Sequence, residues 1–206
     1  MNTNKITLTG KINNVGNAFL AKNGTVCTRC VMEVERLSTT VDTIQLLIPD
    51  TVAKHDYLVT VANNESNCVT IQGSLRSANK VENNKRKLVL YVHVDTISEE
   101  EPDEFNFNSI EMTGTIVRKP MYRHTPLGRI VADVFIAHNP DDKKTSYYFP
   151  CVAWGAAGVN ISNLNVGDKI KIDGRFQSRK YNKIVDDKVE ERTAYEISIN
   201  NFVVEE

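Results

Sequence analysis

The two halves of this 206-residue chain repeat one pattern, and this repeat limits the fold more than any other sequence feature. Residues 5–12 align with residues 109–116 at an offset of 104, and residues 69–75 align with residues 170–176 at an offset of 101. One difference in loop length between the halves would produce that change of offset. An internal duplication is the economical explanation, so we expect each half to fold as a similar unit of about 100 residues.

An acidic stretch separates the two halves. It reads SEEEPDE from Ser98 onward and contains five carboxylates, a proline and no apolar side chain. Such a composition is typical of a linker between domains. We therefore expect a first domain over residues 1–97, an acidic linker over residues 98–107 and a second domain over residues 108–206.

Each half contains five runs of alternating or β-branched apolar residues, which predict β-strands. The only stretch that predicts a helix is short, near residues 156–164, between the third and fourth runs of the second half. Five strands with a helix in this place are typical of the OB-fold, a five-stranded Greek-key barrel, although SH3-like barrels also have five strands. We expect an all-β chain of two tandem OB-folds. The runs cover residues 6–12, 26–34, 43–48, 69–75 and 88–97, and then 110–117, 130–137, 146–154, 169–177 and 193–202.

Composition narrows the function classes. Hydrophobic residues make up 41% of the chain and charged residues 25%, which is enough to bury a core. No apolar run approaches the ~20 residues of a membrane span, and the first residues do not resemble a secretory signal, so we expect a cytoplasmic protein without a membrane partner. The net charge is −1. A nucleic-acid function would therefore need a local basic patch and exposed aromatic side chains.

Catalytic and metal-binding motifs are missing from the sequence. Cys27 and Cys30 form a C-x-x-C pair, but they lie in a predicted strand, and no second pair follows at zinc spacing. Buried thiols are the simpler interpretation. The sequence contains no G-x-S-x-G, P-loop or H-E-x-x-H motif. We expect no metal, no cofactor, no small-molecule substrate and no enzyme activity.

Several segments of the second half occur in a familiar order. They resemble the bacterial single-stranded DNA-binding protein family in its first strand, its T-P-x-G hairpin, its third strand and its fourth strand. The resemblance covers about residues 108–203 and implies an OB-fold that binds single-stranded DNA. The segments are Met112-Thr113-Gly114, Pro120, RHTPLG from Arg123, FPCVAWG from Phe149, VGDKIKIDGR from Val166 and QSRKY from Gln177.

The resemblance implies base stacking on aromatic side chains. Tyr148 and Trp154 are six residues apart, so both face the same side of one strand, and the odd-numbered residues 149–153 face the core. Tyr181 matches the aromatic residue on the family's long hairpin between strands four and five. A register slip of one residue would put Tyr147 in place of Tyr148, and Trp154 could instead be a core residue.

Basic residues near these aromatics are the candidate phosphate contacts. The family has another aromatic after its second strand, where this chain has His138, and we expect Phe135 to lie in the core. Pro150 cannot donate a ladder hydrogen bond, which indicates an edge or a bulge in the third strand. The predicted nucleic-acid-binding residues are Tyr148, Trp154, Tyr181, Arg123, Arg175, Arg179, Lys180 and Lys183.

The first half contains three aromatic residues, whereas residues 109–206 contain ten. Thr43, Pro49 and Lys80 stand near the positions of Tyr148, Trp154 and Tyr181. We therefore interpret residues 1–97 as a degenerate OB-fold with a structural or dimer-forming role, or as a low-affinity extension of the groove. Some branches of the family carry two OB-folds per chain and pair as dimers, so a homo-oligomer with four barrels is expected by analogy.

The leading hypothesis is sequence-tolerant binding of single-stranded DNA in replication, recombination or repair. The alternative is a tandem OB-fold protein-interaction module, or a replication-restart accessory, without strong nucleic-acid binding. The near-zero net charge and the aromatic-poor first half favour the alternative. Single-stranded RNA is a third possible ligand, because RNA and DNA grooves use similar chemistry.

Overall fold

The computed structural model describes residues 3–64, 66–82, 85–99, 107–125, 127–141, 145–185 and 188–205. These residues form eleven strands and two short helices in the order β1 (Asn4–Asn13), β2 (Ala18–Leu20), β3 (Val26–Glu35), β4 (Val41–Pro49), α1 (His55–Ala62), β5 (Val69–Glu82), β6 (Lys85–Ser98), β7 (Asn108–His124), β8 (Ile130–His138), β9 (Tyr147–Trp154), α2 (Gly155–Ser162), β10 (Lys169–Val185) and β11 (Lys188–Glu205).

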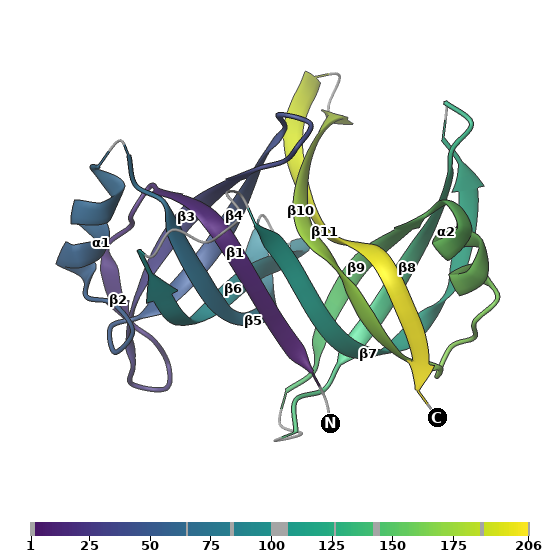
Figure 1. Cartoon of the computed structure of the whole chain (residues 1–206), viewed down its shortest axis with the longest axis horizontal. Coiled ribbons are helices and arrows are strands. Elements are labelled where there is room, and N and C mark those ends of the chain that lie inside the picture. The colour runs from purple at the N-terminus through teal and green to yellow at the C-terminus, as the bar shows by residue number, and fades with distance from the viewer. Residues whose placement is uncertain are drawn as a thin grey trace.

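Two β-barrels lie side by side, the first built from β1–β6 and the second from β7–β11 (Figure 1). In the first barrel β1 pairs with β3 and β5, and β4 runs parallel to β6. In the second barrel β7 pairs with β8 and β10, and β9 runs parallel to β11. The two pairing patterns are equivalent. The predicted all-β fold with two tandem OB-folds is therefore confirmed.

All ten predicted strands are present, but three predictions about the elements were incomplete. The first barrel also contains a helix, α1, which has Asp56 in its first turn and buries Leu58 and Val61 against the core. The short strand β2 was not predicted. The hairpin arms of β5–β6 and β10–β11 extend well beyond the predicted runs, because backbone pairing continues through polar residues such as Lys180, opposite Thr193.

Gly73 and Gly174 occupy the same place in the two barrels. Each lies beside a register shift in its hairpin, where the backbone of the partner strand passes close to it. A Cβ atom on Gly73 would lie 2.1 Å from the His93 carbonyl oxygen, and one on Gly174 would lie 2.2 Å from the Ser198 carbonyl oxygen. Only glycine fits there, and the shared requirement supports the internal duplication.

The barrels join edge to edge through β1 and β7, which pair antiparallel with Ile6 opposite Ile110. These two residues are equivalent in the repeat, so the barrels are related by an approximate two-fold axis. The Asn4 side chain donates to the Leu75 carbonyl (2.8 Å) and accepts from its N–H (3.0 Å). Asn108, the repeat partner of Asn4, makes the same two bonds with Phe176, at 2.7 and 3.0 Å.

A buried ionic contact forms a second junction between the barrels. The Asp42 carboxylate is fully buried and accepts hydrogen bonds from Nε and Nη2 of Arg36, at 2.8 and 2.6 Å. It also accepts from the backbone N–H of Ser178 on β10 at 2.7 Å, and Arg36 Nη2 donates to the Ser178 carbonyl at 2.9 Å. We call these three residues the Asp42 clamp. The clamp fixes β10 at the base of its hairpin arm.

The predicted linker lies mostly outside the described residues. At its borders the Tyr57 hydroxyl donates to the Glu99 carboxylate at 2.5 Å, and the Thr9 N–H donates to the Phe107 carbonyl at 2.8 Å. Burial, together with the hydrogen bond to Glu99, raises the pKa of Tyr57 to about 12. Within the described residues, neither helix has the length and apolar character that crossing a membrane requires.

Candidate nucleic-acid interface

The predicted facing of the third strand of the second barrel is confirmed. Tyr148 and Trp154 on β9 are 42% and 43% exposed, whereas Phe149, Cys151 and Ala153 are 2% exposed or less. The register slip does not occur, because Tyr147 packs against the hydrophobic core. Two aromatic rings therefore stand on the outer face of the second barrel, where a ligand can reach them.

Tyr148 belongs to a stack that crosses three strands. Its ring lies 6.3 Å from that of Phe135 on β8, with an angle of 18° between the planes. The guanidinium of Arg118 on β7 lies 5.5 Å from the Phe135 ring centre. The expectation that Phe135 lies in the core was wrong. It shares the outer face with Asp133, two residues earlier, while Val134 and Ile136 point inward.

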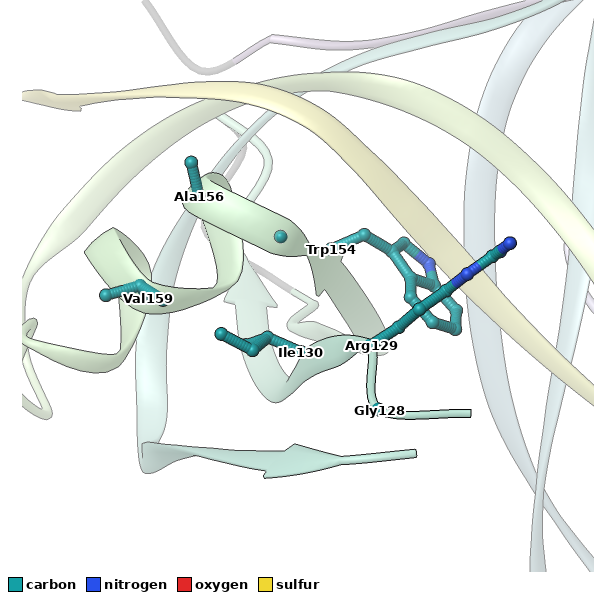
Figure 2. A pocket seen from close by; sticks show the side chains of 7 residues that line it. Gly128, Arg129, Ile130, Trp154, Ala156 and Val159 are labelled. Carbon is teal, nitrogen blue, oxygen red and sulfur yellow. The ribbon is translucent and has the colours of Figure 1, made fainter. Parts of the chain in front are cut away.

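Trp154 stands beside an open hollow of about 570 Å³ (Figure 2). The hollow lies between the turn before β8 and the first turn of α2. Ile130, Ala156 and Val159 supply apolar lining, and Gly155 makes the sharp turn into α2 with a φ of +57°. The side chain of Arg129 extends to the same side as the indole in Figure 2. The hollow thus combines a flat aromatic surface with a cation.

Tyr181 is 37% exposed and lies on the hairpin arm of β10 and β11. Arg179, Tyr181 and Lys183 alternate along one side of β10, with the Arg179 guanidinium 5.8 Å from the Tyr181 ring centre. Arg192 lies opposite Tyr181 on β11. Lys180 points to the other side of the strand. The arm therefore carries a second aromatic site surrounded by cations.

Carboxylates neutralise part of the predicted basic set. Three cations form no ion pair within 4.0 Å among the described residues, namely Lys183 of the predicted set and also Arg118 and Arg129. Three of the predicted cations pair with carboxylates of the second barrel, and the pairs of Arg123 and Lys180 are exposed on both sides and therefore weak enough for a phosphate to displace. The three pairs are Arg123 with Asp133 at 3.1 Å, Arg179 with Glu196 at 3.9 Å and Lys180 with Glu191 at 3.0 Å.

Arg175 lies apart from the other predicted residues, at the junction of the two barrels. Its Nη2 atom is 3.8 Å from the Asp42 carboxylate, and its side chain is 31% exposed. Burial lowers the pKa of Arg175, as does the charge of Arg36, while Asp42 opposes the change. His138, where the family has an aromatic, is buried with Nδ1 2.8 Å from the Thr113 carbonyl oxygen. His138 therefore provides no exposed ring, and Arg175 faces the Asp42 carboxylate.

The sequence hypothesis thus selected three aromatics that are exposed, Tyr148, Trp154 and Tyr181, but not Tyr122, which is 54% exposed. It placed Phe135 in the core and did not include Arg118 and Arg129 among the predicted binding residues. For Phe135 a signal was present, because Asp133 marks the outer face of the same strand. Arg118 and Arg129 could be placed only from the three-dimensional pairing of β7 with β8 and of the turn with α2.

Known proteins resemble the second half of the chain in sequence. Residues 107–204 match the model of the single-strand binding protein family. The single-stranded DNA-binding protein of Malacoplasma penetrans (strain HF-2) is 32% identical over 76 residues, which is 36% of this chain and 40% of that protein. Single-stranded DNA-binding protein 1 of Staphylococcus aureus (strain COL) is 31% identical over 80 residues, 36% of this chain and 48% of that protein. The match therefore spans less than half of each relative.

Solved structures resemble the whole chain in fold. Wild-type single-stranded DNA binding protein from Thermus aquaticus superposes with a TM-score of 0.75 at 15% identity, over 100% of this chain and 94% of that one. A deletion mutant of the same protein gives 0.71, over 99% and 95%. The shared fold includes both barrels. The second half of the chain, residues 107–204, therefore resembles the single-strand binding protein family in sequence, and the whole chain resembles the Thermus aquaticus protein in fold.

Proposed function

We propose that the second barrel binds single-stranded DNA without sequence preference, by stacking bases on its outer aromatic side chains. The observation that carries the proposal is the exposure of Tyr148, Trp154 and Tyr181 on the second barrel and its arm, at 37–43% each. Every base has a π-face, so such platforms hold any sequence, at about 1–3 kcal/mol per stacked base. Phe135 widens the platform of Tyr148.

The cations around these rings supply the phosphate contacts in our proposal. Arg118, Arg129 and Lys183 are not neutralised by described carboxylates, so they are the first candidates. In the hollow of Figure 2, a base would lie against Trp154 with its phosphate near Arg129. Each contacted phosphate releases counterions, which lowers the affinity by about 0.7 log units per log unit of salt for a single strand.

The experiment is an equilibrium titration of labelled oligo(dT) and of a mixed-sequence oligonucleotide, followed by fluorescence anisotropy. The proposal predicts similar binding of both strands, weakened by salt, and much weaker binding of duplex DNA of the same length. Tight binding of the duplex, or no binding of either single strand, would overturn it. A titration with an RNA strand of the same sequence separates DNA from RNA as the preferred ligand.

We further propose that two chains associate, giving four barrels, and that the assembly acts in the cytoplasm on strands exposed in replication, recombination or repair, without catalysis. Support comes from the two-barrel chain and its fold likeness to the Thermus aquaticus structures. Sedimentation equilibrium tests the assembly, because a dimer has twice the 23.2 kDa mass of one chain. A single-chain mass at micromolar concentration would contradict it.

A protein-interaction module is the second candidate function. The observation that favours it is the neutralisation of Arg123, Arg179 and Lys180 by carboxylates, which leaves fewer free cations than the sequence indicates. The anisotropy titration separates the two functions, because an interaction module would leave both strands unbound at low salt.

A further inference from the structure

The outer face of the first barrel carries a cluster of cations and rings outside the positions that sequence comparison assigns to stacking. Arg29 on β3 lies opposite Leu47 on β4, which lies beside His93 on β6. On the same face, Tyr91 lies two residues before His93 and opposite Arg76 on β5. Residues directly opposite each other project from the same side of a sheet. Arg29, Arg76 and Tyr91 therefore share one face of β3, β4, β6 and β5.

Phe19 on β2 completes this cluster, which we call the Arg29 patch (Phe19, Arg29, Arg76 and Tyr91). The Arg29 guanidinium lies 4.1 Å from the centre of the Phe19 ring. That is the shortest of the three cation–ring distances among the described residues. A guanidinium resting on a ring presents its N–H groups outward in a fixed orientation, as bidentate recognition of a phosphate requires.

The two arginines of the patch have no acidic partner in the part of the chain that the structure describes. Among the described residues, no carboxylate lies within 4.0 Å of the guanidinium of Arg29 or of Arg76, whose Nε makes only a 3.4 Å contact with the Ser74 hydroxyl. Asp95 is the acidic neighbour on β6, and it lies 3.3 Å from His93. The patch thus contrasts with the second barrel, where carboxylates hold several of the basic side chains. Two neighbouring guanidinium groups that no carboxylate neutralises attract an anionic ligand.

Electrostatic effects on neighbouring groups show that the two charges converge. Burial raises the pKa of Tyr91, and the charges of Arg76 and Arg29 both oppose that rise. Burial also lowers the pKa of His93, and Arg76 lowers it further, while Asp95 opposes the change. The Tyr91 hydroxyl therefore lies within the field of both guanidiniums, which places cation and ring together at one site.

The Arg29 patch lies close to the proposed interface of the second barrel. Ser77, the chain neighbour of Arg76 on β5, accepts a hydrogen bond from the Tyr148 N–H at 2.8 Å, and its side chain projects from the opposite side of β5 to that of Arg76. Tyr147, the residue before Tyr148, lies near enough to the patch to add to the rise that burial causes in the pKa of Tyr91. Building on the proposed function, we propose that the Arg29 patch is a second contact surface for the same DNA strand. A strand leaving the Tyr148 platform would cross to the first barrel, where Arg29 and Arg76 contact its phosphates and Tyr91 stacks on a base.

The test is the length dependence of oligo(dT) binding by the double variant Arg29→Ala/Arg76→Ala of the full chain. One OB-fold occupies about 4–16 nucleotides, so a 10-mer fits one barrel and a 30-mer spans both. We expect unchanged affinity for the 10-mer and weaker binding of the 30-mer. Two lost phosphate contacts reduce the slope of log affinity against log salt concentration by about 1.4. Between 50 and 200 mM salt, the affinity of the wild type for the 30-mer should therefore fall by a factor about sevenfold larger than the affinity of the variant does.

The matched control is Lys5→Ala/Lys54→Ala, which removes two exposed charges from the first barrel outside the patch and should bind both lengths like the wild type. The proposal would be overturned if the Arg29/Arg76 variant bound the 30-mer as tightly as the wild type does. An equal loss of affinity for the 10-mer and the 30-mer would also overturn it, because the defect would then lie in the second barrel. Failure of the wild type to bind either length would instead refute the proposed function itself.

A second measurement needs no variant. A 30-mer containing 5-bromodeoxyuridine is cross-linked to the wild-type protein by ultraviolet light, and the labelled peptides are identified by mass spectrometry. The proposal predicts labelled peptides that contain Tyr91 or Phe19 in addition to those of the second barrel. Cross-links confined to the second barrel would overturn it, whatever the folding of the double variant.

Discussion

Replacing Asp42 by alanine is expected to destabilise both barrels, although Asp42 belongs only to the first. The substitution removes the acceptor of two bonds from Arg36 and of one bond from the Ser178 N–H. Breaking a buried ion pair by removing one partner typically costs about 3–5 kcal/mol. The Arg36 side chain is 20% exposed and regains some water, so we expect the low end of that range, about 3 kcal/mol.

Urea unfolding measures this effect, with two signals that report different barrels. Trp154, the single tryptophan, reports the second barrel, and circular dichroism reports all strands. Because the clamp holds β10, the Trp154 transition should shift to lower urea concentration together with the dichroism. The control is Asp133→Ala, which breaks an exposed pair with Arg123 and should cost less than about 1 kcal/mol.

Two results would refute the reasoning. A loss below about 1 kcal/mol for Asp42→Ala would mean that the buried carboxylate contributes no more than a surface pair. An unchanged Trp154 transition beside a shifted dichroism signal would mean that the clamp stabilises the first barrel alone, and that the barrels unfold independently.

Three further predictions concern the site and the core. Tyr181→Ala and Phe135→Ala should each weaken oligo(dT) binding by about 1–3 kcal/mol in an anisotropy titration, and wild-type affinity in both variants would contradict base stacking at those rings. Arg76→Ala should raise the pKa of His93 in an NMR titration. Because a depressed histidine pKa costs stability as the pH falls through it, the variant should lose less stability on acidification below about pH 6.5 than the wild type. Burial raises the pKa of Cys30 to about 11, so this thiol should stay unreactive toward a disulfide reagent at pH 8 until the protein unfolds, and rapid labelling of native protein would contradict its burial.

Strand positions and the facing of Tyr148 and Trp154 could be predicted because a strand has a side-chain period of two, which the chain shows directly. The same rule could have placed Phe135 outside, since Asp133 shares its face. The prediction that Phe135 lies in the core was based only on the apolar character of its side chain. The assumption that an apolar side chain belongs in the core fails here, because the Phe135 ring packs against Tyr148 on the outer face.

Other features depend on contacts between segments distant in the chain, which local pattern does not encode. Arg175 matches the family motif, yet the first barrel brings Asp42 to within 3.8 Å of it. The Arg29 patch forms from β2, β3, β5 and β6, and each of these strands contributes one of its four residues. The positions of the first barrel that are equivalent to Tyr148, Trp154 and Tyr181 hold no aromatic residue. The rings of the Arg29 patch, Phe19 and Tyr91, lie at other positions of the first barrel.

The most direct test of the central claim is a titration of the intrinsic fluorescence of Trp154 with a long oligo(dT), first at low salt and then at higher salt. Base stacking on the outer face of the second barrel predicts strong quenching that reaches a plateau and that salt reverses. Tight binding without any change in fluorescence would remove Trp154 from the interface. The absence of both binding and quenching at low salt would contradict the account that this barrel binds single-stranded DNA.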